Sequence, residues 1–236
     1  MLEALFDLLF PPSCASCDAR LGPRAPEPFC EGCALSVDRL AAPFCLRCGV
    51  PFDAAGPSHC CGRCLRRPPP YTLARAPFLY GGALQDAIHR YKYEGHWTLA
   101  RPLGQLLTGA ILDLDPQSFD LVVPVPLHPR RLAERGFDQA VPLARAVARR
   151  HRLSLALRAL RRTRPTTPQA LLSGLARRRN VQNAFSVPRP REIEGLRVLL
   201  VDDVLTTGAT AAACARALLA AGATAVGVLT LARAAP

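Results

Sequence analysis

The sequence lacks any apolar run approaching the roughly eighteen residues needed to cross a bilayer, which argues against an integral membrane protein. Residues 1–10 superficially resemble a secretory signal. They carry acids where such a signal has basic residues, and no small-residue cleavage site precedes Pro11. We therefore expect a cytoplasmic protein in which residues 1–10 form a short amphipathic helix.

Lysine is also scarce, because Lys92 is the one lysine among 30 basic residues, while the net charge is +12. Residues 1–70 are neutral, with seven arginines and seven acids, whereas residues 71–236 hold 23 basic residues and 11 acids. Residues 130–191 alone contain 16 arginines against two acids. Such an excess attracts phosphorylated ligands or nucleic acid, although compositional drift toward arginine would also produce it. The candidate nucleic-acid contacts are Arg130, Arg131, Arg135 and Arg164.

Aromatic residues are few in this arginine-rich stretch, where Phe137 and Phe185 are the only two. Stacking platforms for bases are therefore sparse, and contact with nucleic acid would depend on phosphates. Binding of that kind weakens sharply with salt.

Cysteine, in contrast, is concentrated, since nine of ten cysteines precede residue 65. Two sets follow the pattern C-x2-C-x12-C-x2-C, the second 31 residues after the first: Cys14, Cys17, Cys30, Cys33 and Cys45, Cys48, Cys61, Cys64. The repeat indicates a duplication. It also identifies Cys61, not its neighbour Cys60, as the ligand-type cysteine.

Paired CxxC knuckles place four thiolates around one point, which favours structural zinc, one or two ions in all. A disulfide framework is the alternative, but it is typical of secreted chains. The spacing leaves open whether each repeat holds its own ion or the knuckles exchange partners. His59 is a substitute ligand in principle, although a bystander role is favoured.

The proline-rich run Arg66–Pro70 resists both helix and strand, so we place a boundary there. Residues 1–70 would form the N-terminal helix and a double zinc-ribbon module. Residues 71–236 would form a second domain.

Beyond residue 71, apolar runs alternate with helical patterns. We expect strands at 121–126, 196–201 and 225–231, and helices at 139–150 and 209–221. Strands alternating with helices predict an α/β fold with a parallel sheet, and ligands bind at the carboxyl ends of such strands.

One segment carries most of the predicted chemistry. An apolar strand ends at two adjacent acids, Asp202 and Asp203, followed by a Thr/Gly loop and a helix. Adjacent carboxylates repel each other and need a ligand or cation, while a helix N-terminus after a glycine suits a phosphate. The phosphate-binding candidates are Thr206, Thr207, Gly208, Ala209 and Thr210. Together, the carboxylates and the loop predict a site for the hydroxyls and the phosphate of one sugar phosphate. Two alternatives stay open, because acid pairs also bind Mg²⁺ in receiver-type phosphorylation domains and Thr/Gly loops are common turns.

The order of these motifs resembles the ComF family of competence proteins over nearly the whole chain. The resemblance rests on the paired CxxC repeats, Val123-Pro124-Val125-Pro126, Arg135-Gly136-Phe137-Asp138-Gln139 and Asp202-Asp203 through Thr210. Arg164 with Gln169, and Arg179-Asn180 before Phe185, also resemble the family. Asp138 departs from it, because Asn is usual at this position.

The resemblance implies a type I phosphoribosyltransferase fold that binds phosphoribosyl pyrophosphate or a related ribose 5-phosphate compound. Asp202 and Asp203, the candidate catalytic residues, would bind the ribose hydroxyls, and residues 206–210 would hold the 5-phosphate. Val123, Pro124, Val125 and Pro126 would receive pyrophosphate, with help from Arg135. Mg²⁺ would accompany this ligand.

Two functions follow from this resemblance. One is an active transferase, in which a nucleophile of unidentified identity attacks the anomeric carbon; whether catalysis is retained stays open. The other is handling or uptake of single-stranded DNA in natural transformation, together with proteins of the uptake machinery. We favour the second, and the two can coexist.

Three isolated residues carry smaller predictions. Lys92 lies beside a turn at Gly95, where a surface position is favoured over a pyrophosphate contact. Cys214 is expected to be a buried thiol and Trp97 a packing residue.

Overall fold

The computed structural model describes residues 12–22, 28–109, 114–164 and 184–235. The helix expected at residues 1–10 lies outside these ranges, as do Gln169, Arg179 and Asn180. Among the described residues, no helix is both long enough and apolar enough to span a membrane.

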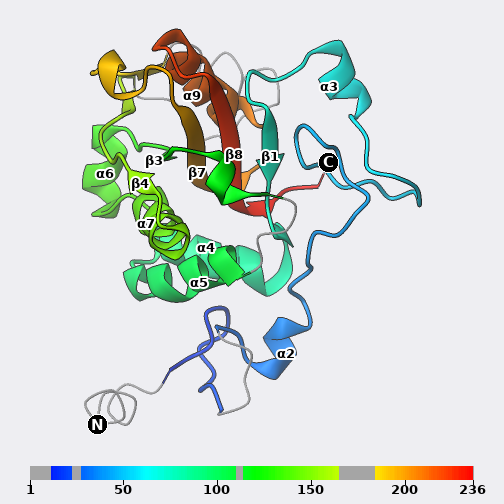
Figure 1. Ribbon diagram of the computed structural model, residues 1–236. Helices are drawn as coiled ribbons and strands as arrows, with labels where there is room; N and C mark the ends of the chain where they lie inside the picture. Colours follow the sequence, from blue (N-terminus) through cyan, green and yellow to red (C-terminus); the bar gives the residue numbers. More distant parts are fainter. Residues whose placement is uncertain (1–11, 23–27, 110–113, 165–183, 236) are drawn as a thin grey trace.

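The centre of the fold is a parallel sheet with strand order β1-β8-β7-β3-β4, and β2 adds to β8 beyond the end of β1 (Figure 1). The strands are β1 (Leu73–Arg75), β2 (Phe78–Leu79), β3 (Leu121–Pro124), β4 (Ser154–Leu155), β7 (Arg197–Leu205) and β8 (Ala225–Arg233). Residues 198–201 of β7 and 225–229 of β8 are apolar without interruption because both faces of the sheet are covered.

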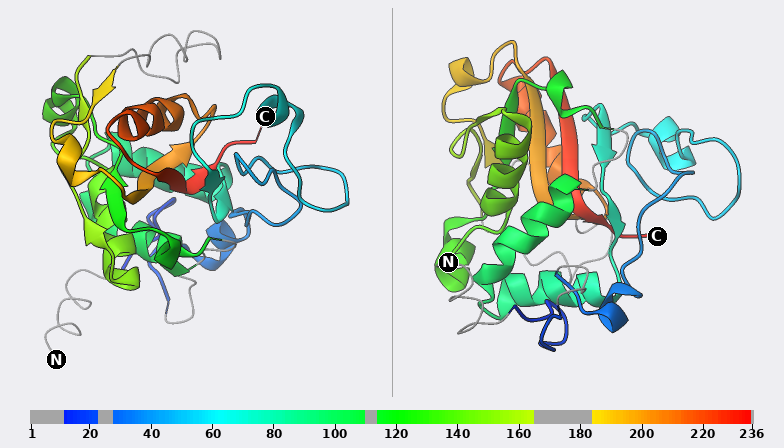
Figure 2. Two further views of the ribbon diagram at one scale, coloured as in Figure 1. Left: turned by 45° about the horizontal axis from the view of Figure 1, so that its top comes forward. Right: turned by 60° about the horizontal axis from the view of Figure 1, so that its bottom comes forward.

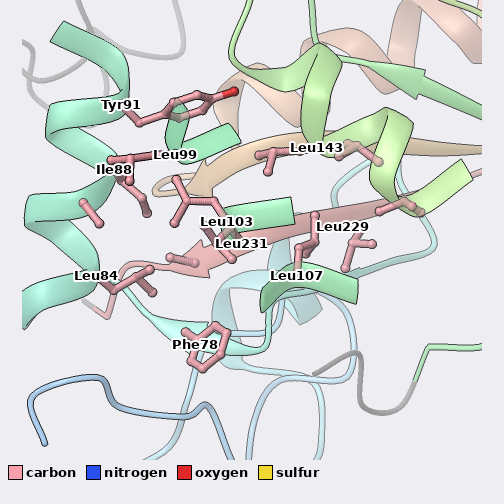
Figure 3. Close-up of a cluster of buried hydrophobic side chains, with 14 of the residues drawn as sticks. Phe78, Leu84, Ile88, Tyr91, Leu99, Leu103, Leu107, Leu143, Leu229 and Leu231 are labelled. Atoms are coloured by element: carbon pink, nitrogen blue, oxygen red, sulfur yellow. The ribbon is translucent and has the colours of Figure 1, made fainter. Parts of the chain in front are cut away.

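Helices α4 (Gly82–Tyr93), α5 (Ala100–Gly109) and α7 (Ala140–His151) cover one face, and α9 (Ala209–Ala220) covers the other (Figure 2). Successive side chains of a strand point to opposite faces. In β7, Leu199 and Val201 accordingly join the cluster under α4, α5 and α7, while Val198 and Leu200 join the cluster under α9. Figure 3 shows the first cluster, in which leucines of α5 lie between α4 and β8.

The remaining elements are short: α2 (Glu31–Ala34), α3 (Gly62–Arg66), α6 (Pro129–Arg135), β5 (Arg161–Arg162), β6 (Phe185–Ser186), and the 3-10 turns Trp97–Leu99, Pro116–Ser118 and Pro190–Glu192. Strands β5 and β6 form a separate antiparallel pair. Helix α6 ends at Gly136, whose left-handed backbone (φ 83°) stops it.

The α/β fold and its parallel sheet are confirmed, and the predicted strands and helices match β3, α7, α9 and β8 within a few residues. The strand predicted to end at residue 201 is wrong in its boundary, because β7 continues through both acids to Leu205. Its partner β8 extends alongside, so the ladder pairs Asp202 with Thr230 and Leu205 with Arg233.

Two predictions for single residues concern side-chain burial. Trp97 is 67% exposed, so its prediction as a packing residue is wrong: it begins a short 3-10 turn whose buried residue is Leu99. Cys214 is fully buried, as predicted.

The two cysteine-rich ribbons lie at different places on the sheet domain (Figure 1). The first lies under α4, where the guanidinium of Arg90 donates to both carboxylate oxygens of Asp18 at 2.7 and 2.6 Å. The second packs on β1, whose Ala74 N–H donates to the carbonyl of Arg47 at 2.8 Å. Both ribbons therefore contact the sheet domain directly.

Candidate functional site: an acid pair and a phosphate-type loop

The candidate site lies at the carboxyl ends of β3 and β7, which are neighbours in the sheet. Pro124, the last residue of β3, pairs with Val201, and the N–H of Val125 donates to the carbonyl of Val201 at 2.9 Å. The Val123–Pro126 segment therefore runs beside the acid pair, as a ligand contacting both would require.

Asp202 and Asp203 point to opposite faces of β7, because consecutive strand residues alternate. Asp203 is buried on the α4 side, whereas Asp202 is partly exposed and its charge acts on Cys214 of α9. The family resemblance assigns both carboxylates the same role. The structure gives them different surroundings.

Lys92 is the cation that compensates Asp203. Its Nζ lies 2.6 Å from Oδ2 of Asp203, and the two side chains are only 17% and 5% exposed. The surface position favoured for Lys92 is therefore wrong: the residue sits in the last turn of α4, which packs on the sheet. Sequence could not find this contact, because 111 residues separate the partners in the chain.

The pKa values follow from these surroundings. Burial lowers the pKa of Lys92, but the charge of Asp203 and the hydrogen bond to it outweigh burial, so the net pKa is raised and the ammonium stays charged. Burial raises the pKa of Asp202 well above its usual range, and the neighbouring Asp203 raises it further, while Lys92 acts in the opposite direction. The surroundings of Asp202 thus disfavour its charged form.

The Thr/Gly loop follows β7 and begins α9. Gly208 is the N-cap of α9 with a left-handed backbone (φ 75°), and the Ala209 N–H lies 3.4 Å from Oγ1 of Thr207. Thr206, Thr207 and Thr210 keep partial exposure, while Gly208 and Ala209 are buried. The structure thus places the predicted loop at a helix N-terminus, where N–H groups and the helix dipole favour an anion.

Asp138 connects the Val123–Pro126 segment to helix α7. Its two carboxylate oxygens accept from the N–H groups of Leu127 at 2.9 Å and Ala140 at 3.0 Å. Burial raises the pKa of Asp138, against the lowering effect of these two bonds. Each bond uses a different carboxylate oxygen as its acceptor, so Asp138 makes both, whereas the usual Asn, with a single acceptor oxygen, would make only one of them.

The predicted nucleic-acid arginines have diverse environments. Arg135 stacks over the ring of Tyr93, 4.9 Å from its centroid, and donates to the side-chain oxygen of Gln139. Arg130 and Arg131 both pair with Glu134, each at 3.2 Å. Arg164 is exposed.

The two aromatic residues of the same stretch pack against other parts of the protein. Phe185 is buried, and Phe137 packs against Tyr91 with ring centroids 5.1 Å apart.

The cysteines form two separate four-sulfur clusters, one per repeat, with sulfur atoms within 4.8 Å of one another. Tetrahedral zinc with Zn–S bonds of about 2.3 Å places sulfurs about 3.8 Å apart. The Sγ distances are 3.8 Å for Cys17–Cys30 and 3.9 Å for Cys48–Cys61. The donor sets therefore fit one structural zinc ion each, which settles the knuckle pairing that the spacing left open. His59 belongs to neither cluster and stacks on Phe52, 4.4 Å between centroids.

A parallel sheet with a strand, an acid pair, a Thr/Gly loop and a helix at its carboxyl edge defines a phosphoribosyltransferase-fold domain. Residues 137–235 match the family model of the phosphoribosyl transferase domain, and residues 5–65 match that of the double zinc ribbon domain.

Relatives that align over most of the chain identify its family. The chain is 38% identical over 211 residues to DNA utilization protein YhgH of Salmonella typhimurium, covering 87% of this chain and 90% of the relative. It is 32% identical over 187 residues to Competence protein F of Haemophilus influenzae, covering 77% and 80%. The chain therefore belongs to the ComF family.

Among solved structures, the allosteric regulatory enzyme of purine biosynthesis aligns with 25% identity and a TM-score of 0.38. The alignment covers 56% of this chain and 25% of that one. This likeness is too low to bear on function.

Proposed function

We propose that the protein binds phosphoribosyl pyrophosphate or a related ribose 5-phosphate compound and supports the handling of single-stranded DNA during its uptake in natural transformation, in the cytoplasm. The observation that supports ligand binding is that the acid pair and the Gly208 loop both lie at the sheet edge beside Val125. The DNA role is supported by the relatives' names, which are DNA utilization and competence proteins, and by the arginine excess.

In this proposal, each part of the ligand contacts a different group of residues. The loop Thr206–Thr210 receives the 5-phosphate, Asp202 and Asp203 receive ribose hydroxyls, and the Val123–Pro126 segment receives pyrophosphate. Carboxylate oxygens are also the donors that Mg²⁺ prefers, so Asp202 would hold the ion that accompanies the ligand. Lys92 already pairs with Asp203, which makes Asp202 the freer carboxylate for that purpose.

The test of the ligand is calorimetric titration with phosphoribosyl pyrophosphate and Mg²⁺. We expect saturable binding by the wild-type protein and its loss in Asp203→Ala. Asp120→Ala is the matched control, because Asp120 pairs with Arg197 at the amino end of the strands. No binding by folded, zinc-loaded wild-type protein would contradict the proposal.

The test of the DNA role uses α6, where one acid neutralises two arginines. Glu134→Gln releases Arg130 and Arg131 and should tighten binding of an oligothymidine several-fold at low salt, with the gain vanishing at high salt. Charge reversal of Arg130, Arg131 and Arg135 should abolish binding. Glu192→Gln frees Arg189 ahead of β7 and serves as the equal-charge control. The same gain in both variants would mean that α6 is not the DNA surface.

The second candidate function is an active, Mg²⁺-dependent phosphoribosyltransferase that acts on a base or amine acceptor. The intact acid pair and loop favour it. Pyrophosphate release from phosphoribosyl pyrophosphate, stimulated by one member of a panel of nitrogen nucleophiles and lost in Asp202→Asn, would establish it. Binding without any release would leave the protein a ligand-binding member of its fold class.

A further inference from the structure

The second ribbon contacts the phosphate-type loop through a buried arginine. Arg233, the last residue of β8, is 6% exposed. Its Nη1 donates to the carbonyls of Leu205 at 2.9 Å and Thr206 at 2.6 Å, and its Nε donates to the carbonyl of Cys48 at 3.1 Å. One guanidinium therefore joins a cysteine knuckle to the start of the loop.

A second arginine comes from the ribbon itself. Arg63 lies on α3 between Cys61 and Cys64, and its Nη2 donates to the carbonyl of Thr207 at 2.6 Å. The next loop residue is also enclosed, because a Cβ at Gly208 would lie 2.9 Å from the hydroxyl of buried Tyr71. Residues 205–208 are thus held from the side of the second ribbon.

These carbonyl contacts orient the loop N–H groups that would bind a phosphate. Each peptide unit is planar and trans, so its N–H points opposite to its C=O. Holding the Thr206 and Thr207 carbonyls toward the arginines directs the N–H groups of Thr207 and Gly208 away from them. Loop N–H groups directed in this way suit an anion at the start of α9.

We propose that the second zinc ribbon positions the loop of the ribose-phosphate site. Arg63 and Arg233 are the positioning residues. They couple ligand binding at the loop to zinc binding at Cys45, Cys48, Cys61 and Cys64. The ligand half of this inference rests on the proposed function. Coupling between two sites is reciprocal, so the ligand must also strengthen zinc retention at this cluster.

The first ribbon is the internal control. Its hydrogen bonds join it to α4: Arg90 donates to the carbonyl of Ala15 at 3.1 Å, and Ser16 donates to Asp86 at 3.1 Å. Among the described residues, it has no hydrogen bond to residues 205–208. Coupling should therefore belong to the second cluster alone.

The first experiment needs no ligand. Hydrogen exchange of peptides covering residues 205–212 should speed up in a Cys61→Ser, Cys64→Ser variant, which lacks the second zinc site, and stay unchanged in Cys30→Ser, Cys33→Ser. Arg63→Ala, with both zinc sites intact, should also speed exchange of this loop. Arg66→Ala, on the same helix, should not. Equal exchange in both cysteine variants, or in both arginine variants, would overturn the proposal.

The second experiment measures coupling in the same two cysteine variants. Where only the second cluster remains, phosphoribosyl pyrophosphate should raise its zinc affinity about fivefold or more, and so lower the fraction of zinc released to a competing chelator at equilibrium. It should leave release from the first cluster unchanged, and Arg63→Ala should reduce the effect. Ligand binding without selective protection overturns the coupling. Absence of ligand binding by calorimetry overturns the proposed function instead, and loop exchange then decides the role of the arginines.

Discussion

At the scale of single residues, the site depends on how buried charges are compensated. Asp203 is almost fully buried and is neutralised by Lys92, whereas Asp202 makes no ion pair with any of the described residues and carries a strongly raised pKa. Two carboxylates that are adjacent in sequence therefore make different contributions to stability.

Lys92→Met should lower the free energy of unfolding by about 3 kcal/mol, because removing one member of a buried ion pair leaves the other charge uncompensated. Urea denaturation near pH 7 measures this loss. The double variant Lys92→Met, Asp203→Asn should recover much of it, since no lone buried charge remains. Losses that simply add would show that the pair is not coupled.

Asp202 should make the folded protein less stable as the pH rises. Its folded pKa lies above its unfolded value, so the folded state binds the extra proton, and stability falls with pH between the two values. We expect Asp202→Asn to weaken this fall above about pH 4, where the unfolded carboxyl titrates. Unfolding midpoints of both proteins across this range test the sign. An identical slope in the two proteins would contradict it.

At the scale of elements, the turn from β7 into α9 requires glycine for two separate reasons. Gly208 has a left-handed backbone, and a side chain there would meet the hydroxyl of Tyr71. Gly95 has the same φ of 75°, but a Cβ added there would meet no atom within 4 Å. The two positions therefore separate backbone strain from crowding.

Gly95→Ala should cost about 1 kcal/mol from left-handed strain alone. Gly208→Ala should cost clearly more, about 2–3 kcal/mol, because Tyr71 must also move. It should weaken ligand binding as well. Chemical denaturation of the two variants gives the comparison, and equal losses would mean that Tyr71 yields without cost.

At the scale of the whole molecule, the zinc ribbons are built into the fold in two ways. The first covers α4, with Cys14, Ala15 and Phe29 in the main hydrophobic cluster. The second lies beside β1 and reaches the loop that begins α9 (Figure 1). Zinc binding to the first ribbon should therefore stabilise the region around α4, and zinc binding to the second should stabilise the loop that begins α9.

Arg90→Ala should lower the free energy of unfolding by about 2 kcal/mol, because it removes a buried guanidinium from Asp18 and from the Ala15 carbonyl. It should also speed zinc loss from the first cluster. Arg101→Ala, exposed on α5, should change stability by no more than about 0.5 kcal/mol. Equal zinc retention in both variants would show that the first ribbon holds its zinc without support from Arg90 of α4.

The sequence alone predicted features that depend on local pattern. Apolar runs predicted β3 and β8, the 3.6-residue period predicted α7, and the 31-residue repeat predicted the eight zinc-ligand cysteines but not their grouping, since each signal lies within a short stretch of chain. Elements α4, α5 and β1 were not predicted, because their burial comes from distant partners. The boundary of β7 was misplaced for the same reason: acids do not end a strand whose neighbour β8 continues beside them.

Only the tertiary structure decided which groups meet across the chain. Sequence spacing identified Asp202, Asp203 and Gly208, but it could not pair Asp203 with Lys92 or bring Arg63 to the carbonyl of Thr207, 144 residues away. The physical reason is that the folding of the sheet sets such contacts, while local pattern sets only which face each residue occupies.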